Sequence, residues 1–365
     1  MGKVDRCTED DVPAIAELHS KVKFDNGESN SDAMRGYYRD VFFRNPWYNN
    51  RFPSFVYRAA GGRVVGFIGV IPRQMRFRGN LIKVAVSHRL MVDPDSGCPL
   101  AASQLVRRFL SGPQDLSFSD GANDMGRKFW EGMGGSTVLI YSMNWIRPLR
   151  PFSYAAYLLA KRKGSGLIAA ASSSVGWLVD TLGAAKWMNS FLPTQTSDYR
   201  SVEADDDLLF CCISEFSKPY TLCPEYDYES WKWLMDFLRS NKHRGMFRAC
   251  AVYKGTQELI GAYVYYLNAS RVGEVMLLLA RNDSRDKVLR HLLYEARKQN
   301  ALCFWGRMEP KFLSCLWDNN CLLKQGSWAL VNTNSPELAE VINRGDAFLT
   351  AMEGELWLRS PRDRL

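Results

Sequence analysis

The sequence has few residues that bind metal ions. Only four of its 365 residues are histidines, and none of them lies at metal-ligand spacing from a second ligand. The nine cysteines form no C-x-x-C pair. These absences exclude the common zinc-site patterns, and we expect no metal cofactor. The histidines are His19, His88, His243 and His291.

The sequence also lacks the usual features of a secreted or membrane-spanning chain. Its odd number of cysteines argues against a complete disulfide framework, and the residues MGKVDRCTEDD do not resemble a signal peptide. The most apolar stretch, residues 154–192, is interrupted by Asp180 and by several serines and glycines. We therefore expect no transmembrane segment and a reducing, cytoplasmic location.

What the chain does contain is enough apolar surface for packed cores, with 46% apolar and 13% aromatic residues. Its length favours two domains. The net charge of +8 favours an anionic partner, such as a phosphate-bearing cofactor, an acidic carrier, RNA or a membrane surface.

The first 146 residues alternate between helical and strand patterns. Two helices come first, then three strands separated by turn residues, then helix, strand, helix and strand. In chain order, the predicted elements are helices over 8–22 and 31–46, strands over 54–60, 64–79 and 82–92, a helix over 98–110, a strand over 114–120, a helix after 123, and a strand over 136–146.

The second half repeats this order of elements, from a helix over 228–241 to a strand over 327–333. A turn or short helix and a final strand are predicted over 343–359. Between the halves lies a basic segment that predicts two helices separated around Gly164. They would either pack as linkers or form an interfacial surface for an anionic partner, with Trp177 and Trp187 on its apolar side.

Two stretches of the first half carry recognisable motifs. One is MVDPDSGCPLAASQL, residues 91–105, which leads from a strand into a helix. The other is SFSDGANDMGRKFWEGMGG, residues 117–135, in which Asn123 precedes a helix that ends at glycines.

These motifs and the order of elements resemble the GNAT acyltransferase superfamily over roughly residues 4–146. The resemblance implies an α+β fold with αβα layers: two tandem GNAT-like domains, each a mixed, mostly antiparallel sheet flanked by helices. The predicted parts are a GNAT-like, acyl-CoA-binding domain (1–147), a helical, basic linker (148–198) and a degenerate second GNAT-like domain (199–365).

The resemblance also implies where acyl-CoA binds. Backbone groups of the fourth strand would hold the thioester and pantetheine, and the following loop and helix start would hold the pyrophosphate. Ser96 replaces the usual arginine and Pro99 replaces a glycine, so this loop is predicted to be weakened or used differently. The implied strand residues are Leu90, Met91 and Val92, and the implied loop residues are Gly97, Cys98, Leu100, Ala101 and Ala102.

In the second motif, Asn123 would cap the helix that lines the acyl-CoA cleft, beside Phe129. Trp130 stands where many members carry a tyrosine that protonates the departing thiolate. An indole N–H donates a hydrogen bond but is not a proton source near neutral pH. The resemblance therefore predicts an enzyme without the usual acid at this helix.

Three residues are candidates for direct catalysis. Strand alternation would place His88 on one face with Val86, Leu90 and Val92, so the imidazole would be the titratable group that faces the cleft. A structural histidine is the alternative. Asp120 could act directly or cap a helix, and Tyr141, expected on the last strand of the domain, could act directly or belong to the core.

The implied function is transfer of an acyl group, expected to be acetyl, from acyl-CoA to an amine of a small molecule or peptide. Two alternatives remain open at this point. One is a Fem-like transferase that takes an aminoacyl group from tRNA, and the other is a carrier-protein-dependent acyltransferase or a non-catalytic acyl-CoA-binding protein. An anionic surface, an acyl carrier protein and tRNA are accordingly candidate partners.

Overall fold

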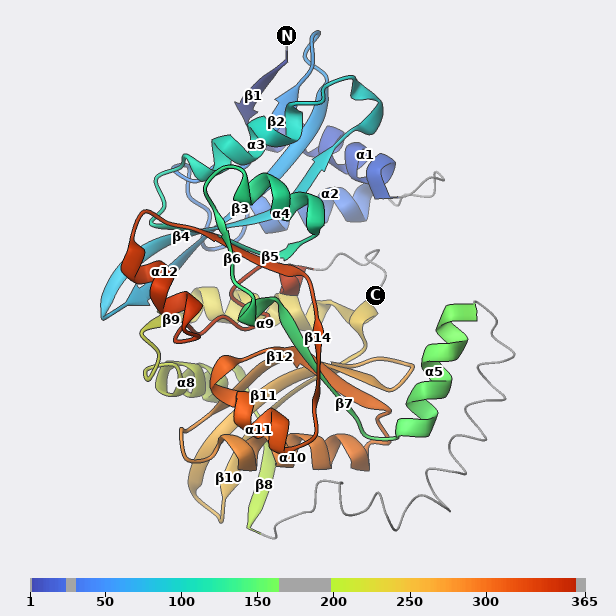
Figure 1. Cartoon of the computed structure of the whole chain (residues 1–365), viewed down its shortest axis with the longest axis vertical. Helices are drawn as coiled ribbons and strands as arrows, with labels where there is room; N and C mark the ends of the chain where they lie inside the picture. The colour runs from blue at the N-terminus through green and yellow to red at the C-terminus, as the bar shows by residue number, and fades with distance from the viewer. Residues whose placement is uncertain (1, 24–30, 164–197, 359–365) are drawn as a thin grey trace.

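The computed structural model describes residues 2–23, 31–163 and 198–358 (Figure 1). In this part of the chain, two mixed sheets flanked by helices make an α+β fold, as the sequence predicts. Within the described residues, no helix combines the length and the apolar character that a membrane span requires.

The first sheet contains the three strands expected after the opening helices, joined as antiparallel hairpins. Short β9 adds to β3 at one end of this sheet. In spatial order the strands are β1 (Lys3–Arg6), β2 (Phe55–Arg58), β3 (Val64–Phe77), β4 (Asn80–Val92), β5 (Leu116–Ala122), β15 (Trp328–Asn332) and β6 (Ser136–Thr137), with β9 (Leu222–Pro224) on β3.

The second sheet repeats the arrangement of two antiparallel pairs followed by a parallel pair. In spatial order its strands are β14 (Leu322–Gln325), β7 (Met143–Pro148), β13 (Cys303–Arg307), β12 (Val272–Ala280), β11 (Glu258–Leu267), β10 (Met246–Lys254) and β8 (Tyr199–Glu203).

The two halves of the chain exchange strands. The single strand predicted over 136–146 is wrong: β6 is followed by a 3₁₀ turn over Ile140–Ser142, and then β7 crosses into the second sheet between β13 and β14. In return, β15 enters the first sheet between β5 and β6 (Figure 1). The apolar pattern of a strand shows that it pairs but not with which sheet, so the sequence did not reveal this exchange. The division at residues 147 and 198 remains a prediction.

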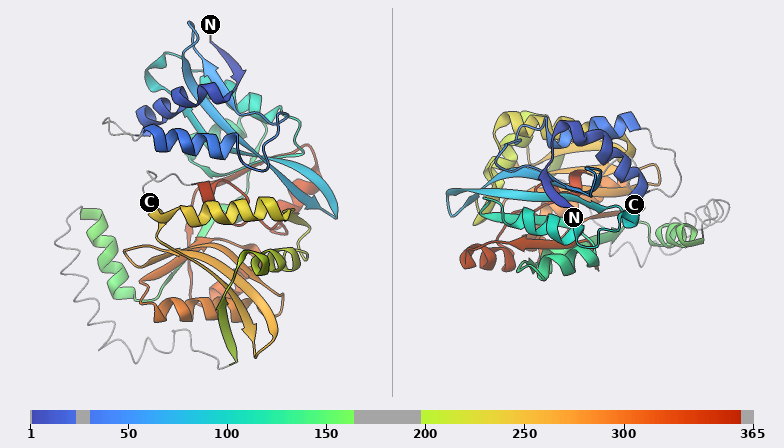
Figure 2. Two further views of the ribbon diagram at one scale, coloured as in Figure 1. Left: turned by 180° about the vertical axis from the view of Figure 1, so that it is seen from behind. Right: turned by 90° about the horizontal axis from the view of Figure 1, so that it is seen from above.

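Helices cover both faces of each sheet. In the view from behind, α9 lies between the two halves (Figure 2). One hydrophobic core cluster includes residues from α1, α2 and α9, so it is shared by both halves. The helices are α1 (Val12–Lys23), α2 (Ser31–Phe42), α3 (Ala101–Leu110), α4 (Asp124–Glu131), α5 (Pro151–Lys163), α8 (Asp206–Phe216), α9 (Tyr228–Ser240), α10 (Arg285–Lys298), α11 (Leu313–Asp318) and α12 (Pro336–Asn343).

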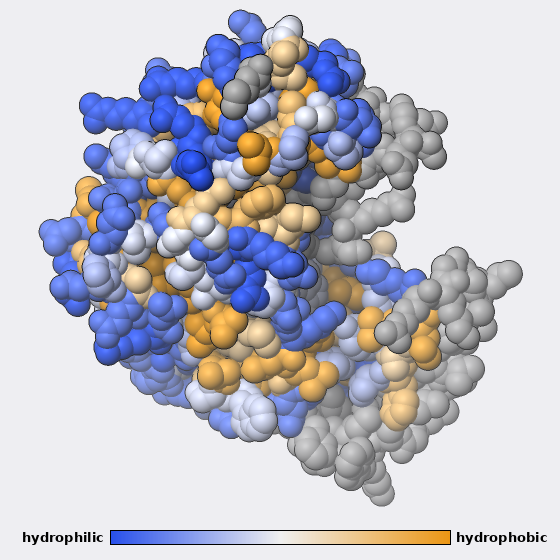
Figure 3. Space-filling view, turned by 45° about the horizontal axis from the view of Figure 1, so that its top comes forward, coloured by the Kyte–Doolittle hydropathy of each residue, from blue (hydrophilic) through white to orange (hydrophobic). Residues whose placement is uncertain are grey.

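Of the predicted basic segment, the first helix is confirmed as α5. The second helix, with Trp177 and Trp187, lies outside the described residues. Elsewhere, apolar side chains reach the surface in patches among hydrophilic ones, as Figure 3 shows for one face.

In each sheet the parallel pair separates partway along. β4 and β5 pair only from Val84–Val86 to Leu116–Phe118, and β12 and β13 pair only up to Val275 and Gly306. Beyond these points the strands diverge and their facing edges no longer bond to each other. Each sheet therefore has an opening between its two parallel strands.

The final strand predicted over 343–359 is wrong. After α12 the chain continues as turns and loops with one isolated bridge, and ends its described part in a 3₁₀ turn over Leu356–Leu358. Near Ala347 its backbone bonds to Leu222 of β9, and farther on side chains from both halves bond to its backbone. We call residues 346–358 the C-terminal segment.

Candidate active site

The β4 strand carries a bulge at the sheet opening. Met91 lies opposite Phe67 and His88 lies opposite Gly69, so two residues of β4 face a single residue of β3. Arg89 within the bulge has a φ of 61°, a left-handed value that is uncommon outside glycine. Bulges of this kind redirect side chains and often lie next to active sites.

The bulge corrects the predicted alternation along β4. Opposed residues of an antiparallel pair point to the same face, so His88 and Met91 share the face of Phe67, and Leu90 and Val92 point to the other. Leu90 and Val92 accordingly pack against the core cluster that contains α3. His88 faces the side of α1, α2 and the C-terminal segment.

His88 is buried, with 5% of its surface exposed, and both ring nitrogens have partners. Nε2 lies 2.9 Å from the hydroxyl of Tyr37 on α2, and Nδ1 lies 2.8 Å from Oε2 of Glu355. The Phe42 ring stacks on the imidazole. A side chain at Gly69 would overlap the Phe42 ring, so this glycine makes room for the stack.

Glu355 projects from the C-terminal segment into the opening between β4 and β5. Its Oε1 accepts hydrogen bonds from the Ser119 hydroxyl at 2.6 Å and from the Gly121 N–H at 3.0 Å. Burial alone would raise the pKa of this carboxyl, but the hydrogen bond and positive charge of His88, with the Ser119 and Gly121 donors, outweigh it and lower the pKa. The site therefore favours an ionised Glu355.

Asp120, on β5 next to Glu355 of the His88–Glu355 pair, is fully buried. Its Oδ1 accepts a 2.6 Å hydrogen bond from the Glu355 N–H, and its carboxylate forms an ion pair with Arg307. Burial raises the pKa of Asp120 to about 6, while the Arg307 charge opposes the rise. Asp120 does not cap α4, because Asn123 does so by accepting from the Gly126 N–H at 2.9 Å.

Tyr141 lies in the 3₁₀ turn between β6 and β7 and not on a strand, which corrects the prediction. Its side chain is buried, and its hydroxyl bonds to both the carbonyl and the N–H of Ala347. Burial raises its pKa well above the ordinary value. Arg307 connects the two regions, since it also donates to the Tyr141 carbonyl at 2.6 Å.

The predicted phosphate loop follows β4 on the other face of the sheet. Gly97 has a φ of 65°, and a side chain there would meet open space. No side chain caps the start of α3, so the N–H groups of its first turn, at Ala102 and Ser103, remain available to an anion. Cys98 bonds locally to Ser96. Leu100 is exposed and Ala101 is buried.

Trp130 lies on this same face, apart from His88. Its indole donates to the Val331 carbonyl at 3.0 Å and its ring contacts Phe109, so it secures the exchanged strand β15 against α3 and α4. Phe129 beside it is partly buried. The structure thus brings His88 and Asp120 together around Glu355, and leaves Tyr141 and Trp130 in packing roles.

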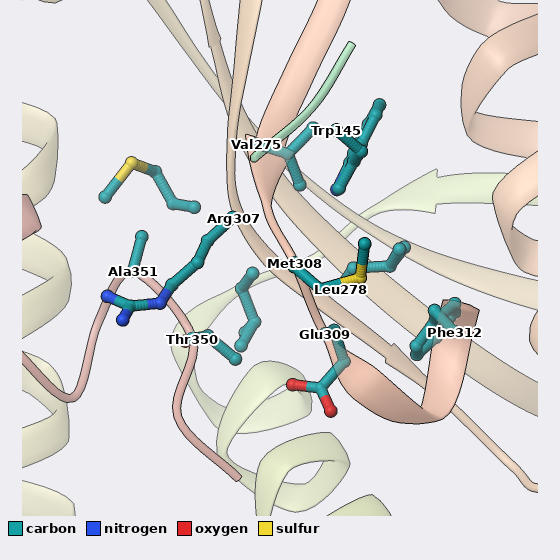
Figure 4. Close-up of a pocket in the computed structure, with 11 residues that line it drawn as sticks. Trp145, Val275, Leu278, Arg307, Met308, Glu309, Phe312, Thr350 and Ala351 are labelled. Atoms are coloured by element: carbon teal, nitrogen blue, oxygen red, sulfur yellow. The ribbon is translucent and has the colours of Figure 1, made fainter. Parts of the chain in front are cut away.

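The opening of the second sheet holds a cavity of about 20 Å³ (Figure 4). Arg307 and Glu309 both line it. Glu309 is buried, and its Oε2 has no hydrogen-bond partner among the described residues, while Oε1 accepts from the Tyr220 hydroxyl. Burial raises the pKa of Glu309 to about 8. The volume suits one water molecule.

Sequence reasoning missed three members of the cluster around His88: Tyr37, Arg307 and Glu355. They come from α2, β13 and the C-terminal segment, more than 50 positions from His88 along the chain. The one available signal was the pair of acids, Glu353 and Glu355, within the apolar stretch AFLTAMEGELWL. Across the described ranges, no group of three acidic, histidine or cysteine side chains is arranged to hold a metal ion.

Comparison with known proteins gives likenesses of structure only. No family model matches the chain, and no curated protein matches its sequence. A probable N-acyltransferase of unknown function from Enterococcus faecalis V583 is 9% identical, with a TM-score of 0.60 over 91% of this chain and 72% of that one.

Two other solved structures are similar. A GCN5-related N-acetyltransferase from Anabaena variabilis is 9% identical, with a TM-score of 0.57 over 91% of this chain and 73% of that one. N-myristoyltransferase from Saccharomyces cerevisiae, with bound myristoyl-CoA, is 13% identical, with a TM-score of 0.51 over 90% and 78%. The chain therefore has a GNAT-like fold.

Proposed function

We propose that this protein is an N-acyltransferase that moves an acyl group from acyl-CoA to an amine. The observation that carries the proposal is the opening between β4 and β5, where a bulge on β4 and the start of α3 lie on one side and the His88–Glu355 pair on the other. The similarity of the fold to the solved structures of a probable N-acyltransferase and an N-acetyltransferase supports the proposal.

The donor would bind on the α3 side of the first sheet. There the backbone of Leu90, Met91 and Val92 would receive the thioester and pantetheine, and the first turn of α3 beyond Gly97 would receive the phosphates. Helix N-termini attract phosphate through free N–H groups and the helix dipole. Pro99 supplies no N–H, which leaves this site one donor fewer.

The acceptor amine would arrive on the opposite face, next to His88. An amine attacks only without its extra proton, and a nearby imidazole can remove one. Glu355 holds Nδ1, so a proton that leaves the amine would end on Nε2. The two substrates would then meet at the opening, each approaching from its own side.

Acetyl is the acyl group that we propose, with a small-molecule or peptide amine as acceptor and a cytoplasmic site of action. The donor could instead be an acyl carrier protein, whose pantetheine would use the same strand. No feature of the described structure favours an aminoacyl-tRNA donor.

Calorimetry with acetyl-CoA, followed by mass spectrometry of a mixture of amines, tests the proposal. We expect micromolar binding and a mass increase of one acyl group on at least one amine.

Gly97→Glu places a negative charge against the donor phosphates and should weaken acetyl-CoA binding at least tenfold without unfolding the protein. Gly134→Glu, a substitution at the positive-φ end of α4, is the matched control. Equal acetyl-CoA affinity in the folded Gly97→Glu protein would contradict this donor site.

A further inference from the structure

His88 is poorly placed to touch an amine directly. The ring is buried, Phe42 covers one side, and both nitrogens already have partners. Tyr37, in contrast, is only partly buried. Its hydroxyl lies 2.9 Å from His88 Nε2 and 2.7 Å from the Leu358 carbonyl, both within hydrogen-bond distance.

The Tyr37 hydroxyl can form its hydrogen bonds in two arrangements. A phenol has one hydrogen to donate, and a carbonyl can only accept. When the imidazole carries protons on both nitrogens, Nε2–H donates to Tyr37, and Tyr37 donates to Leu358. When Nε2 is bare, the Tyr37 hydrogen turns to it. The hydroxyl therefore follows the protonation state of His88.

We propose that Tyr37 is the group that exchanges protons with the substrates, and that His88 and Glu355 are positioning residues acting through it. This inference rests on the proposed function. It supplies the proton source that Trp130 cannot provide, from α2 instead of α4.

The proton steps balance as follows. As the acceptor nitrogen forms its bond to the acyl carbon, its proton moves to the Tyr37 oxygen, and the Tyr37 hydrogen moves to His88 Nε2. When the carbon–sulfur bond breaks, the thiolate takes a proton from Tyr37, and Nε2–H returns its proton to the phenol. For an acceptor that enters as the neutral amine, no oxidant, metal or net proton is required.

The charges around His88 support this cycle. Ionised Glu355 faces Nδ1 and stabilises the imidazolium that forms midway. Asp120 accepts a hydrogen bond from the Glu355 N–H, and the positive charge of Arg307 balances the negative charge of Asp120. Tyr37 on α2 and Glu355 on the C-terminal segment are titratable side chains in direct contact with the ring.

The first experiment is kinetic. Tyr37→Phe removes only the hydroxyl and should lower the acyl-transfer rate at neutral pH by roughly 10²–10⁴-fold. Tyr48→Phe, which removes an exposed hydroxyl bonded to Asn50, should keep the full rate.

Because the relay acts as a unit, the double variant Tyr37→Phe/His88→Ala should be no slower than His88→Ala alone. A full rate in Tyr37→Phe, or losses that multiply in the double variant, would overturn the relay and leave the proposed function standing.

The second experiment needs no activity. Nitrogen-15 NMR of the imidazoles, with His88 assigned from His88→Gln, reports which ring nitrogen is protonated and bonded. Tyr37→Phe should shift the Nε2 signal and Glu355→Gln the Nδ1 signal, while Tyr48→Phe shifts neither. An unchanged Nε2 signal in Tyr37→Phe would overturn the relay even if no amine is ever acylated, whereas failure of acetyl-CoA to bind would count against the proposed function alone.

Discussion

At the scale of single residues, the molecule contains buried carboxyls in opposite states. Glu355 is surrounded by donors and has a lowered pKa, whereas Glu309 faces a water-sized cavity and has a pKa raised to about 8. The difference comes from partners, since the Glu355 side chain, with 12% of its surface exposed, is nearly as enclosed as that of Glu309. Because Glu309 has fewer donors than Glu355, burial dominates and the Glu309 carboxyl keeps its proton to a higher pH.

Glu309 should make the protein less stable as the pH rises. The pKa of Glu309 is above its ordinary value of 4.5 in the folded state, so the folded protein holds a proton that the unfolded chain has lost. The contribution is fully present below pH 4.5 and disappears as the pH rises through about 8.

Glu309→Gln, which cannot ionise, should remove this pH dependence and be more stable than the parent at pH 8 by one to several kcal/mol, roughly. Urea unfolding between pH 6 and 8.5 measures it. Glu337→Gln, at an exposed ion pair, is the control and should keep the parent slope. The prediction fails if Glu309→Gln retains that slope.

The Asp120–Arg307 pair joins the first sheet to the second, and both side chains are buried. Arg307→Met leaves an unpaired buried carboxylate and should cost about 3–5 kcal/mol of unfolding free energy. The double variant Asp120→Asn/Arg307→Met should recover part of that loss. Chemical denaturation measures the unfolding free energy of the parent and both variants. A double variant less stable than Arg307→Met would contradict the stabilising role of the ion pair.

At the scale of elements, α2 and β3 fit together through a missing side chain. Gly69 lets the Phe42 ring lie against β3 and stack on His88. Because the neighbours are a ring and a backbone carbonyl, a methyl group has no flexible side chain to displace. The position of α2, and with it Tyr37, depends on this contact.

Gly69→Ala should therefore destabilise the protein by about 1–3 kcal/mol. Gly36→Ala is the matched control, since Gly36 lies within α2 with nothing near its missing side chain. That change should stabilise by about 0.5–1 kcal/mol, because glycine is a poor helix former. Thermal unfolding of both variants measures these changes in stability. If Gly69→Ala leaves the stability unchanged, α2 can shift freely.

At the scale of the whole molecule, the exchange of β7 and β15 makes each sheet depend on both halves of the chain. The core cluster shared by α1, α2 and α9 adds to this dependence. The C-terminal segment adds more, since Arg73 and Arg244, from different halves, both donate to its backbone carbonyls.

A fragment of residues 1–147 should consequently fail to fold alone, because it lacks β15 and the segment that carries Glu355. We expect poorly dispersed amide signals in its proton–nitrogen NMR spectrum and no cooperative thermal transition. Adding the fragment 148–365 should restore both. A well-dispersed spectrum from 1–147 alone would show that the exchange is not needed for folding.

The sequence by itself determined the local elements, the α+β class and the GNAT-like fold. Alternation and helical spacing predicted α1 to α4, the β2–β3–β4 hairpins and the repeat in the second half, because these patterns follow from neighbours along the chain. Local residues offered Asp120 or Asn123 as a helix cap and placed His88 on a strand, and the GNAT resemblance implied that this strand lines the cleft.

Only the tertiary structure decided which sheet receives β7 and β15, which face His88 shares, and what surrounds it. A bulge shifts alternation by one residue without a clear sequence signal. Tyr37 and Glu355 reach His88, and Arg307 reaches Asp120, through long-range packing. Beyond its bridge to β9, the C-terminal segment forms no strand, and its backbone bonds to distant side chains at Met352, Glu355 and Leu358. Such contacts exist only after the two halves have closed on each other, and no local pattern encodes them.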